Sequence, residues 1–353
     1  MTFEEARALF PALERIAYLN AGTVGPLARP VADALVDGVG RDLADGRSGM
    51  PFFETMLAAR AELRTAFARL VDADDEQLAL TTSTSEGCGI VLRGLGLEPG
   101  DEIVTTTDEH FGLLGPLGAS GARVVVVEPD PERILAAVTP RTRLVAASQA
   151  LWTTGAVLPL AEIRERSGVP VLADGAQSVG AIEASVAGVD FLTISGQKWL
   201  CGPDTTGALV VADPERLMVR SPSYFGQRRY EPDGAFEPQE GARRFETTWL
   251  ARGTLRGMLA ALELRPEWWL ERATAMAERC RELLSSHVEL VRPEHVSTLA
   301  AFRPEREPAE VVASLHESDV HVRELPGRGL VRVSCGWWTS DDDLERLVAA
   351  LVT

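Results

Sequence analysis

The decisive stretch of this sequence is Asp190-Phe191-Leu192-Thr193-Ile194-Ser195-Gly196-Gln197-Lys198-Trp199, a run of strand-forming residues that leads into a turn of small and polar residues. It contains Lys198, the only lysine of a 353-residue chain whose other basic residues are arginines. A lysine amine can form a Schiff base with a carbonyl compound, whereas an arginine guanidinium does not do so in water. Its position after a strand favours a covalent anchor over an ordinary surface lysine.

Seven short runs of strand-forming residues alternate with helix-like stretches in the first two thirds of the chain. Several consist almost entirely of Val, Leu, Ile and Ala, as expected for parallel strands that are covered by helices on both faces. The pattern predicts an α/β fold with a mainly parallel seven-stranded sheet. The runs are residues 77–81, 102–106, 123–127, 143–148, 170–174, 191–195 and 208–212.

Polar residues follow five of these runs. In open α/β sheets a ligand lies beyond the carboxyl ends of the strands, so these clusters are expected to meet at one site. They are residues 83–87, 108–111, 149–155, 174–177 and 195–198.

The pattern changes after residue 213. Residues 221–245 are rich in Gly, Pro, Arg and Glu without a sustained period, which predicts a long surface loop over the site. Helical character returns near residue 254, and the chain ends in short strands and a helix, typical of a smaller α+β unit. We expect residues 20–262 to form the large domain, and residues 1–19 with 263–353 to form the small one.

The composition excludes several classes of partner. A formal net charge of -17 argues against binding to nucleic acid or to an anionic membrane surface. No export signal or membrane span is recognisable, and Cys88, Cys201, Cys280 and Cys335 lack metal-ligand spacing. We therefore expect a cytoplasmic protein with reduced thiols.

A second motif, Ala173-Asp174-Gly175-Ala176-Gln177-Ser178, places Asp174 24 residues before Lys198. With both motifs the sequence resembles the fold type I enzymes that depend on pyridoxal 5'-phosphate, and among them the aminotransferase class V family. This family includes cysteine desulfurases, isopenicillin N epimerase-like proteins and cysteine/cystine C-S lyases. The resemblance extends from Tyr18-Leu19-Asn20-Ala21-Gly22 to Arg332-Val333-Ser334. It implies pyridoxal 5'-phosphate as cofactor, the two-domain fold and a homodimer.

The resemblance assigns roles around the cofactor ring. Asp174 matches the carboxylate that keeps the pyridine nitrogen protonated, so that the ring can accept electrons from the substrate Cα; the alternative for Asp174 is a helix N-cap. Gln177 matches the residue that hydrogen-bonds the ring hydroxyl. His110, in Asp108-Glu109-His110-Phe111-Gly112, matches the histidine that stacks on the ring, with Phe111 as the alternative.

The cofactor phosphate is expected at the start of a helix near residue 84, where hydroxyls and backbone N–H groups can hold it. A Ser/Thr cluster at such a place is more often only a cap. By the resemblance Thr84 and Ser85 are phosphate ligands, joined by Ser195 and by Gln197, which replaces the histidine usual in desulfurases and cannot titrate. Thr247 or Thr248 resembles a residue that crosses the dimer interface to the partner's cofactor phosphate.

The substrate carboxylate is expected at Arg332, in a strand resembling the one whose arginine makes a bidentate pair with the amino acid. The alternative is that Arg332 is one more surface arginine. Gln149 and Trp152 follow the fourth strand run and face the same region by the resemblance, and Asn20 reaches it from the N-terminal segment.

The reaction follows from details around this site. Desulfurases need a cysteine on a loop shortly before the carboxylate-binding arginine, and residues 312–331 contain none. Strand alternation turns Cys335 away from the face of Arg332. Residues 196–203, 223–226 and 243–246 look closest to C-S lyases, which implies an α,β-elimination with Lys198 as the base and pyruvate, ammonia and a thiol or persulfide as products. An aminotransferase or epimerase stays open; a desulfurase or a non-catalytic PLP-binding protein is less favoured.

Overall fold

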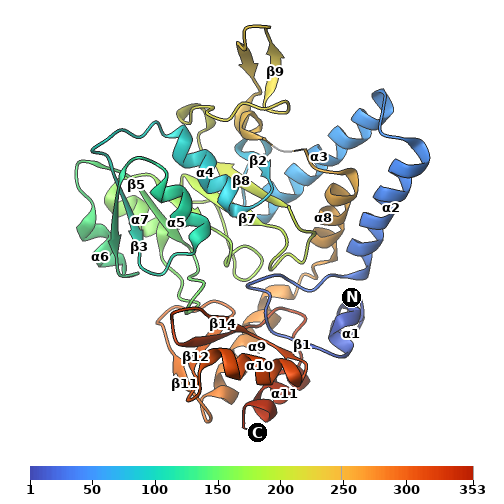
Figure 1. Cartoon of the computed structure of the whole chain (residues 1–353), viewed down its shortest axis with the longest axis vertical. Coiled ribbons are helices and arrows are strands. Elements are labelled where there is room, and N and C mark those ends of the chain that lie inside the picture. The colour runs from blue at the N-terminus through green and yellow to red at the C-terminus, as the bar shows by residue number, and fades with distance from the viewer. Residues whose placement is uncertain (248, 353) are drawn as a thin grey trace.

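A seven-stranded sheet forms the centre of the large domain in the computed structural model, which describes residues 1–247 and 249–352 (Figure 1). Its strand order is β2-β8-β7-β6-β5-β3-β4; β8 runs antiparallel to both of its neighbours, and the other pairs are parallel. All seven predicted runs are strands, so the predicted sheet is confirmed. They are β2 (Leu78–Thr81), β3 (Glu102–Thr106), β4 (Arg123–Val127), β5 (Thr142–Ser148), β6 (Val171–Asp174), β7 (Phe191–Ser195) and β8 (Gly207–Val211).

Both faces of this sheet are buried, which explains the nearly continuous apolar strands. Alternate residues such as Leu78 and Leu80 enter one core, and Ala79 between them enters a second core on the other face. The first core is completed by α3 (Met50–Leu70), α6 (Pro131–Ala137), α7 (Leu160–Ser167) and α8 (Arg252–Leu264). The second is completed by α4 (Thr84–Gly94) and α5 (Phe111–Gly118).

The long helix α2 (Arg29–Asp45) lies along α8 at the side of the large domain (Figure 1). Two glycines permit this close contact, because a Cβ on Gly38 would lie 2.3 Å from the Cα of Gly253.

The segment 221–245 differs from the predicted loop. It contains the hairpin β9 (Gln227–Tyr230) and β10 (Phe236–Pro238), which projects from the body of the protein. Ion pairs from Arg228 to Glu237 and Glu240 join its strands, a cross-strand pattern that local periodicity did not reveal.

The smaller α+β domain contains an antiparallel sheet of order β11-β12-β15-β14 and its own apolar core. A parallel pair, β1 with β13, joins the N-terminal segment to it, and Ala17 and Leu19 belong to that core. The division at residues 19 and 262 stays a prediction. The remaining elements are α1 (Phe3–Arg7), β1 (Ala17–Tyr18), α9 (Trp269–Leu284), β11 (Glu289–Val291), β12 (Leu299–Arg303), α10 (Pro308–Glu317), β13 (Val320–His321), β14 (Arg323–Leu325), β15 (Leu330–Ser334) and α11 (Asp341–Leu351).

Within residues 1–247 and 249–352, no helix combines the length and the hydrophobicity that crossing a bilayer requires.

Candidate active site

Asp174 and Lys198 lie at the carboxyl ends of adjacent strands. Asp174 ends β6 and is buried, and its Oδ1 accepts hydrogen bonds from the backbone N–H of Ala176 (3.0 Å) and from Oγ1 of Thr193 (3.2 Å). Lys198 comes three residues after the end of β7. Burial lowers the pKa of the Lys198 amine to about 8, although the negative charge of Asp174 opposes this shift. Near neutral pH a useful fraction of this amine is therefore neutral, as a nucleophile or a base must be.

The predicted phosphate ligands lie at the start of α4. The helix cap is Ser83, whose Oγ accepts from the backbone N–H of Glu86 (3.2 Å), so the hydroxyls of Thr84 and Ser85 are not needed for capping. At this N-terminus the helix dipole favours an anion. Ser195 Oγ donates to Gln197 Oε1 (3.0 Å), which leaves the Gln197 amide N–H groups to donate elsewhere.

The segment predicted to cross to a partner subunit contacts α4 of its own chain. Thr247 Oγ1 donates to Glu86 Oε1, and Glu86 in turn accepts from the backbone N–H and the hydroxyl of Thr82. Thr248 lies outside the described residues. The cross-subunit role of either threonine stays a prediction.

His110 caps α5, where its Nδ1 accepts from the backbone N–H of Gly112 (3.1 Å). Its ring meets Trp152 edge to face, with centroids 5.3 Å apart. Burial and the charge of Lys198 lower the pKa of His110, against the pull of Asp174. The hydrogen bond that Nδ1 accepts fits a tautomer with its proton on Nε2, and the flat face of the ring is suited to stacking on an aromatic ring. Phe111, the alternative, is 77% exposed on the same helix.

Arg332 is buried in β15 without an opposite charge. Its guanidinium donates to the Trp152 carbonyl (3.0 Å) and to Thr23 Oγ1 (3.2 Å), while its Nε has no partner and no carboxylate of residues 1–247 and 249–352 pairs with it. Burial lowers its pKa to about 9, helped by the nearby charge of Arg323. A buried cation without a counter-ion is costly, so the arrangement is suited to a carboxylate ligand. The surface-arginine alternative is wrong.

The N-terminal segment completes this side of the site. Asn20 is linked to Arg332 through Thr23, because Asn20 Oδ1 accepts from Thr23 Oγ1 (2.8 Å), which itself accepts from Arg332. The role of Asn20 toward the substrate stays a prediction. A Cβ on Gly22 would lie 2.7 Å from the Arg332 guanidinium, so a larger residue at this position would displace that guanidinium. Gln177 donates to the Gly22 carbonyl (2.8 Å) and accepts from the Trp199 indole N–H (3.0 Å). One amide hydrogen of Gln177 remains for a ring hydroxyl.

These residues fit pyridoxal 5'-phosphate and an amino acid. The Gln149 amide oxygen, the Trp152 indole N–H and the Arg332 Nε are buried polar atoms that lack any partner in the described part of the chain. Buried polar atoms normally have partners, so a bound molecule is the natural one here. Residues 1–247 and 249–352 hold no group of three or more His, Cys, Asp or Glu side chains arranged as metal ligands.

Sequence reasoning missed the role of Glu109. Its buried carboxylate accepts a hydrogen bond from Thr106 Oγ1 (2.7 Å) and two from Ser148, one from the backbone N–H (3.0 Å) and one from the hydroxyl (2.5 Å). These bonds join the ends of β3 and β5 beside His110. Burial raises the pKa of Glu109 to about 7, and these hydrogen bonds oppose the shift. Thr23 and Thr193 were missed as well. Glu109 and Thr193 lie inside motifs singled out in the sequence, and Thr23 directly follows one, but residue type alone did not reveal the partners of these side chains.

The comparisons with known proteins agree on one family. Residues 18–347 match the family model described as Aminotransferase class-V. The chain belongs to the aminotransferase class V family. The predicted family and fold are thereby confirmed.

Relatives of this class V protein have several activities. It is 29% identical to the isopenicillin N epimerase of Streptomyces clavuligerus over 99% of this chain and 97% of that protein. It is 33% identical over 226 residues to a probable cysteine desulfurase of Methanothermobacter thermautotrophicus, over 59% of this chain and 56% of that protein. The structure of the cystine C-S lyase C-DES with its reaction product cysteine persulfide is similar with a TM-score of 0.90 and 27% identity, covering 97% of this chain and 98% of C-DES. Another C-DES structure has glycine covalently linked to its PLP cofactor.

In this class V protein, Arg332→Lys should raise KM for amino-acid substrates by about tenfold or more, with a smaller effect on kcat. The change keeps a positive charge but loses the planar fork that binds a carboxylate at two points. Steady-state kinetics would measure this, with the exposed Arg292→Lys as the control. Unchanged KM would remove Arg332 from the substrate site.

Glu109→Gln should reduce the pH dependence of stability of this class V protein. The folded-state pKa of about 7 lies above the usual value of 4.5, so the folded protein holds an extra proton between these values and loses stability as pH rises through this window. Without the carboxyl group, this loss should shrink by up to about 3 kcal/mol. Urea unfolding at about pH 5 and about pH 8 would measure it. The exposed Glu128→Gln should leave the loss in place.

Proposed function

We propose that this class V enzyme is a C-S β-lyase that uses pyridoxal 5'-phosphate and acts on cysteine, cystine or a cysteine conjugate. One molecule of water is consumed, and the products are pyruvate, ammonia and a thiol or persulfide, or hydrogen sulfide when cysteine is the substrate. The observation that carries the proposal is the absence of an available thiol among the residues of the site, because a desulfurase needs a cysteine to accept the sulfur. The structural similarity to C-DES, which is named a cystine C-S lyase, also supports the proposed lyase activity.

All four cysteines are free and buried. Cys335 continues the alternation of Val331 and Val333 into the core of the small domain, away from Arg332, as predicted. Burial raises the pKa of the Cys88 and Cys201 thiols, and a hydrogen bond with Cys280 together with burial raises that of Cys335. Buried thiols held in the protonated form are poor nucleophiles.

The residues of the site have separate tasks in this elimination. When bound, pyridoxal 5'-phosphate supplies an aldehyde for an amine and a ring that accepts electrons. Asp174 keeps the ring nitrogen protonated, and His110 covers the ring. Arg332 fixes the substrate carboxylate, which presents the Cα hydrogen to the Lys198 amine. Lys198 takes that proton, and the sulfur leaves from Cβ without help from an enzyme thiol.

A second cation beside Arg332 favours substrates with two carboxylates. Arg323 on β14 is paired with Arg332 on β15, so the two side chains extend from the same face of the sheet. Arg323 is exposed and makes no ion pair with the described residues. After burial, its charge lowers the pKa of Arg332, and after burial, Lys198 and Arg332 it is the smallest cause that lowers the pKa of His110. Two like charges side by side favour a ligand that is anionic at both ends. Cystine carries such a second carboxylate.

The test is a product assay with purified holoenzyme and cystine, cysteine and S-alkyl cysteines. We expect pyruvate and ammonia, with cystine the preferred substrate. Alanine formed in proportion to sulfide would instead identify a desulfurase, and transfer of the amino group to an added keto acid would identify an aminotransferase.

A variant without cysteines, with Cys88, Cys201, Cys280 and Cys335 replaced by alanine or serine, should keep most of the pyruvate-forming activity. Elimination uses the Lys198 amine and needs no thiol. The variant would first be checked for folding by circular dichroism and for bound cofactor by absorbance. If a single cysteine replacement abolishes sulfur release from a folded holoenzyme, the lyase proposal fails.

Epimerisation is the second candidate reaction, because the sequence similarity to the isopenicillin N epimerase of Streptomyces clavuligerus extends over almost the whole of this chain. An epimerase returns the proton to Cα on the opposite face. Incubation in deuterium oxide distinguishes the two: an epimerase accumulates the other stereoisomer with deuterium at Cα, whereas a lyase consumes the substrate.

We also propose that the enzyme is a homodimer in the cytoplasm. Val36, Val39 and Leu43 are 69%, 69% and 87% exposed, and their spacing places them on one stripe of α2 that a second subunit would cover. The four free cysteines are consistent with a reducing compartment.

Light scattering during gel filtration should give the molecular mass of two chains. The substitution Val39→Asp on the exposed stripe of α2 should shift the measured mass toward that of one chain.

A further inference from the structure

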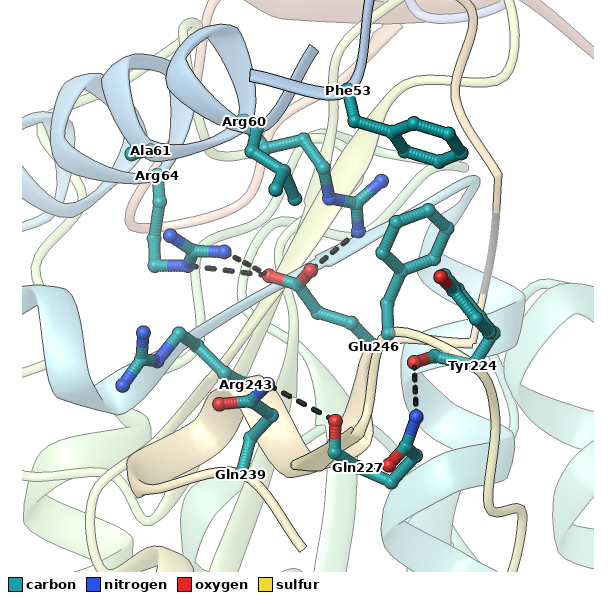
Figure 2. A pocket seen from close by; sticks show the side chains of 11 residues that line it. Phe53, Arg60, Ala61, Arg64, Tyr224, Gln227, Gln239, Arg243 and Glu246 are labelled. Atoms are coloured by element: carbon teal, nitrogen blue, oxygen red, sulfur yellow. Dashed lines mark hydrogen bonds and ion pairs between the residues drawn. The ribbon is translucent and has the colours of Figure 1, made fainter. Parts of the chain in front are cut away.

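A pocket of about 410 Å³ lies between α3, the loop at Phe225 and the segment that leads to Glu246 (Figure 2). It shares no lining residue with the candidate active site. Three arginines and one glutamate line it, from two segments far apart in the sequence: Arg60 and Arg64 on α3, and Arg243 and Glu246 in or after the 3₁₀ helix Gly241–Phe245.

The single carboxylate of this pocket is fully used. Glu246 is buried, and its Oε2 pairs with Arg60 while its Oε1 accepts from Arg64 Nη2 (2.6 Å) (Figure 2). The same Oε1 also accepts from the backbone N–H of Leu80 (3.3 Å). One negative charge therefore faces three positive ones. The lining keeps a net charge of +2, since 3 - 1 = 2.

Arg243 is the arginine of this pocket whose charge is not paired within residues 1–247 and 249–352. It is half-buried, and its side chain makes no hydrogen bond or ion pair with any residue the structure describes. The Gln227 amide oxygen in the same wall is buried and also has no partner among the described residues. The pocket thus offers an unused donor group and an unused acceptor.

The other wall is apolar. Phe53, Leu57 and Tyr224 line it, and Phe225 lies beneath the Arg60 guanidinium, 4.2 Å from its carbon to the ring centroid. Leu57 and Tyr224 are more than half exposed. A ligand seated here would cover their apolar surface while its charged end meets the arginines.

We propose that this pocket binds a small organic anion, a carboxylate or a phosphate ester attached to an apolar body. The anionic group lies at Arg243 and Arg64, and the body packs on Phe53 and Tyr224. The volume is in the range of small-molecule sites, about 300–1,000 Å³. The inference goes beyond the proposed reaction and does not depend on it.

The site adjoins the predicted phosphate cradle through one short segment. Glu246 forms the floor of the pocket, and the next residue, Thr247, donates to Glu86 in the first turn of α4. A bound anion would therefore contact the segment that also supports the start of this helix.

Phenyl phosphate is the probe, titrated by calorimetry into holoenzyme that is saturated with cofactor. We expect Arg243→Ala to weaken its binding by about tenfold or more, because a charge-assisted contact is lost. Arg229→Ala is the matched control: it removes the same charge from the exposed strand β9 and should change affinity less than about twofold. Phenol lacks the anion and inorganic phosphate lacks the ring, so both should bind more weakly.

Equal affinity of wild type and a folded Arg243→Ala would overturn the proposal. So would a crystal structure of the dimeric holoenzyme with phenyl phosphate in which a side chain of the second subunit fills the pocket. Neither outcome bears on pyruvate formation, so failure here is distinguishable from failure of the proposed reaction.

Discussion

Lys198→Ala should reduce turnover of this enzyme by roughly 10³-fold or more, the size of loss expected when a catalytic amine is removed. The physical reason is that no other side chain can take its place. Lys198 is the only lysine of the chain, so the N-terminal amine is the only other primary amine of the protein. Burial has also tuned it, since the Lys198 pKa of about 8 keeps part of the amine neutral at physiological pH.

The same uniqueness makes the measurement unambiguous. Borohydride reduction of the wild-type holoenzyme, followed by peptide mapping, should find the cofactor on the peptide with Lys198 and nowhere else. Lys198→Arg is the matched control, because it keeps a positive charge between Asp174 and Arg332 but should be as inactive as Lys198→Ala. A protein that stays colourless after incubation with pyridoxal 5'-phosphate would contradict the assignment.

Asp174→Asn should lower kcat by roughly 10²- to 10³-fold while leaving cofactor bound, because it removes one preorganised charge from the site. The exchange is nearly isosteric. The oxygen of an asparagine can still accept from the Ala176 backbone N–H and from Thr193 Oγ1, so the strand end should keep its geometry. Only the negative charge that favours a protonated ring nitrogen is lost.

A pH profile separates this effect from a structural one. Asp174 raises the pKa of Lys198 against the stronger influence of burial, so without its charge the amine becomes neutral at lower pH. The limb of the kcat profile that belongs to the free Lys198 amine should therefore move to lower pH. The exposed Asp204→Asn should leave both kcat and the profile unchanged. Near wild-type turnover of Asp174→Asn would show that Asp174 is not the partner of the ring nitrogen.

The sheet was predictable because its strands are buried on both faces, which requires apolar residues at successive positions and makes the runs visible in the sequence. The positions of Asp174, Lys198 and His110 at one edge of the sheet were predictable for a related reason, and their roles stay predictions. Each lies at or just after the end of a strand, and the carboxyl ends of neighbouring parallel strands meet at one edge whatever the details of packing. The hairpin at residues 227–238 was missed, because its strands are short, exposed and held by cross-strand ion pairs.

By itself the sequence determined the family, the sheet and the candidate anchor, which depend on residue type and on spacing along the chain. Tertiary structure decided the environments. It brought Gly22 against Arg332, placed Arg323 beside Arg332 across two strands, and left Arg332 buried without a counter-ion among the described residues. It also buried Glu109 against Ser148. The burial, the hydrogen-bond partners and the pKa of a side chain depend on segments that are far apart in the chain, so no local pattern encodes them.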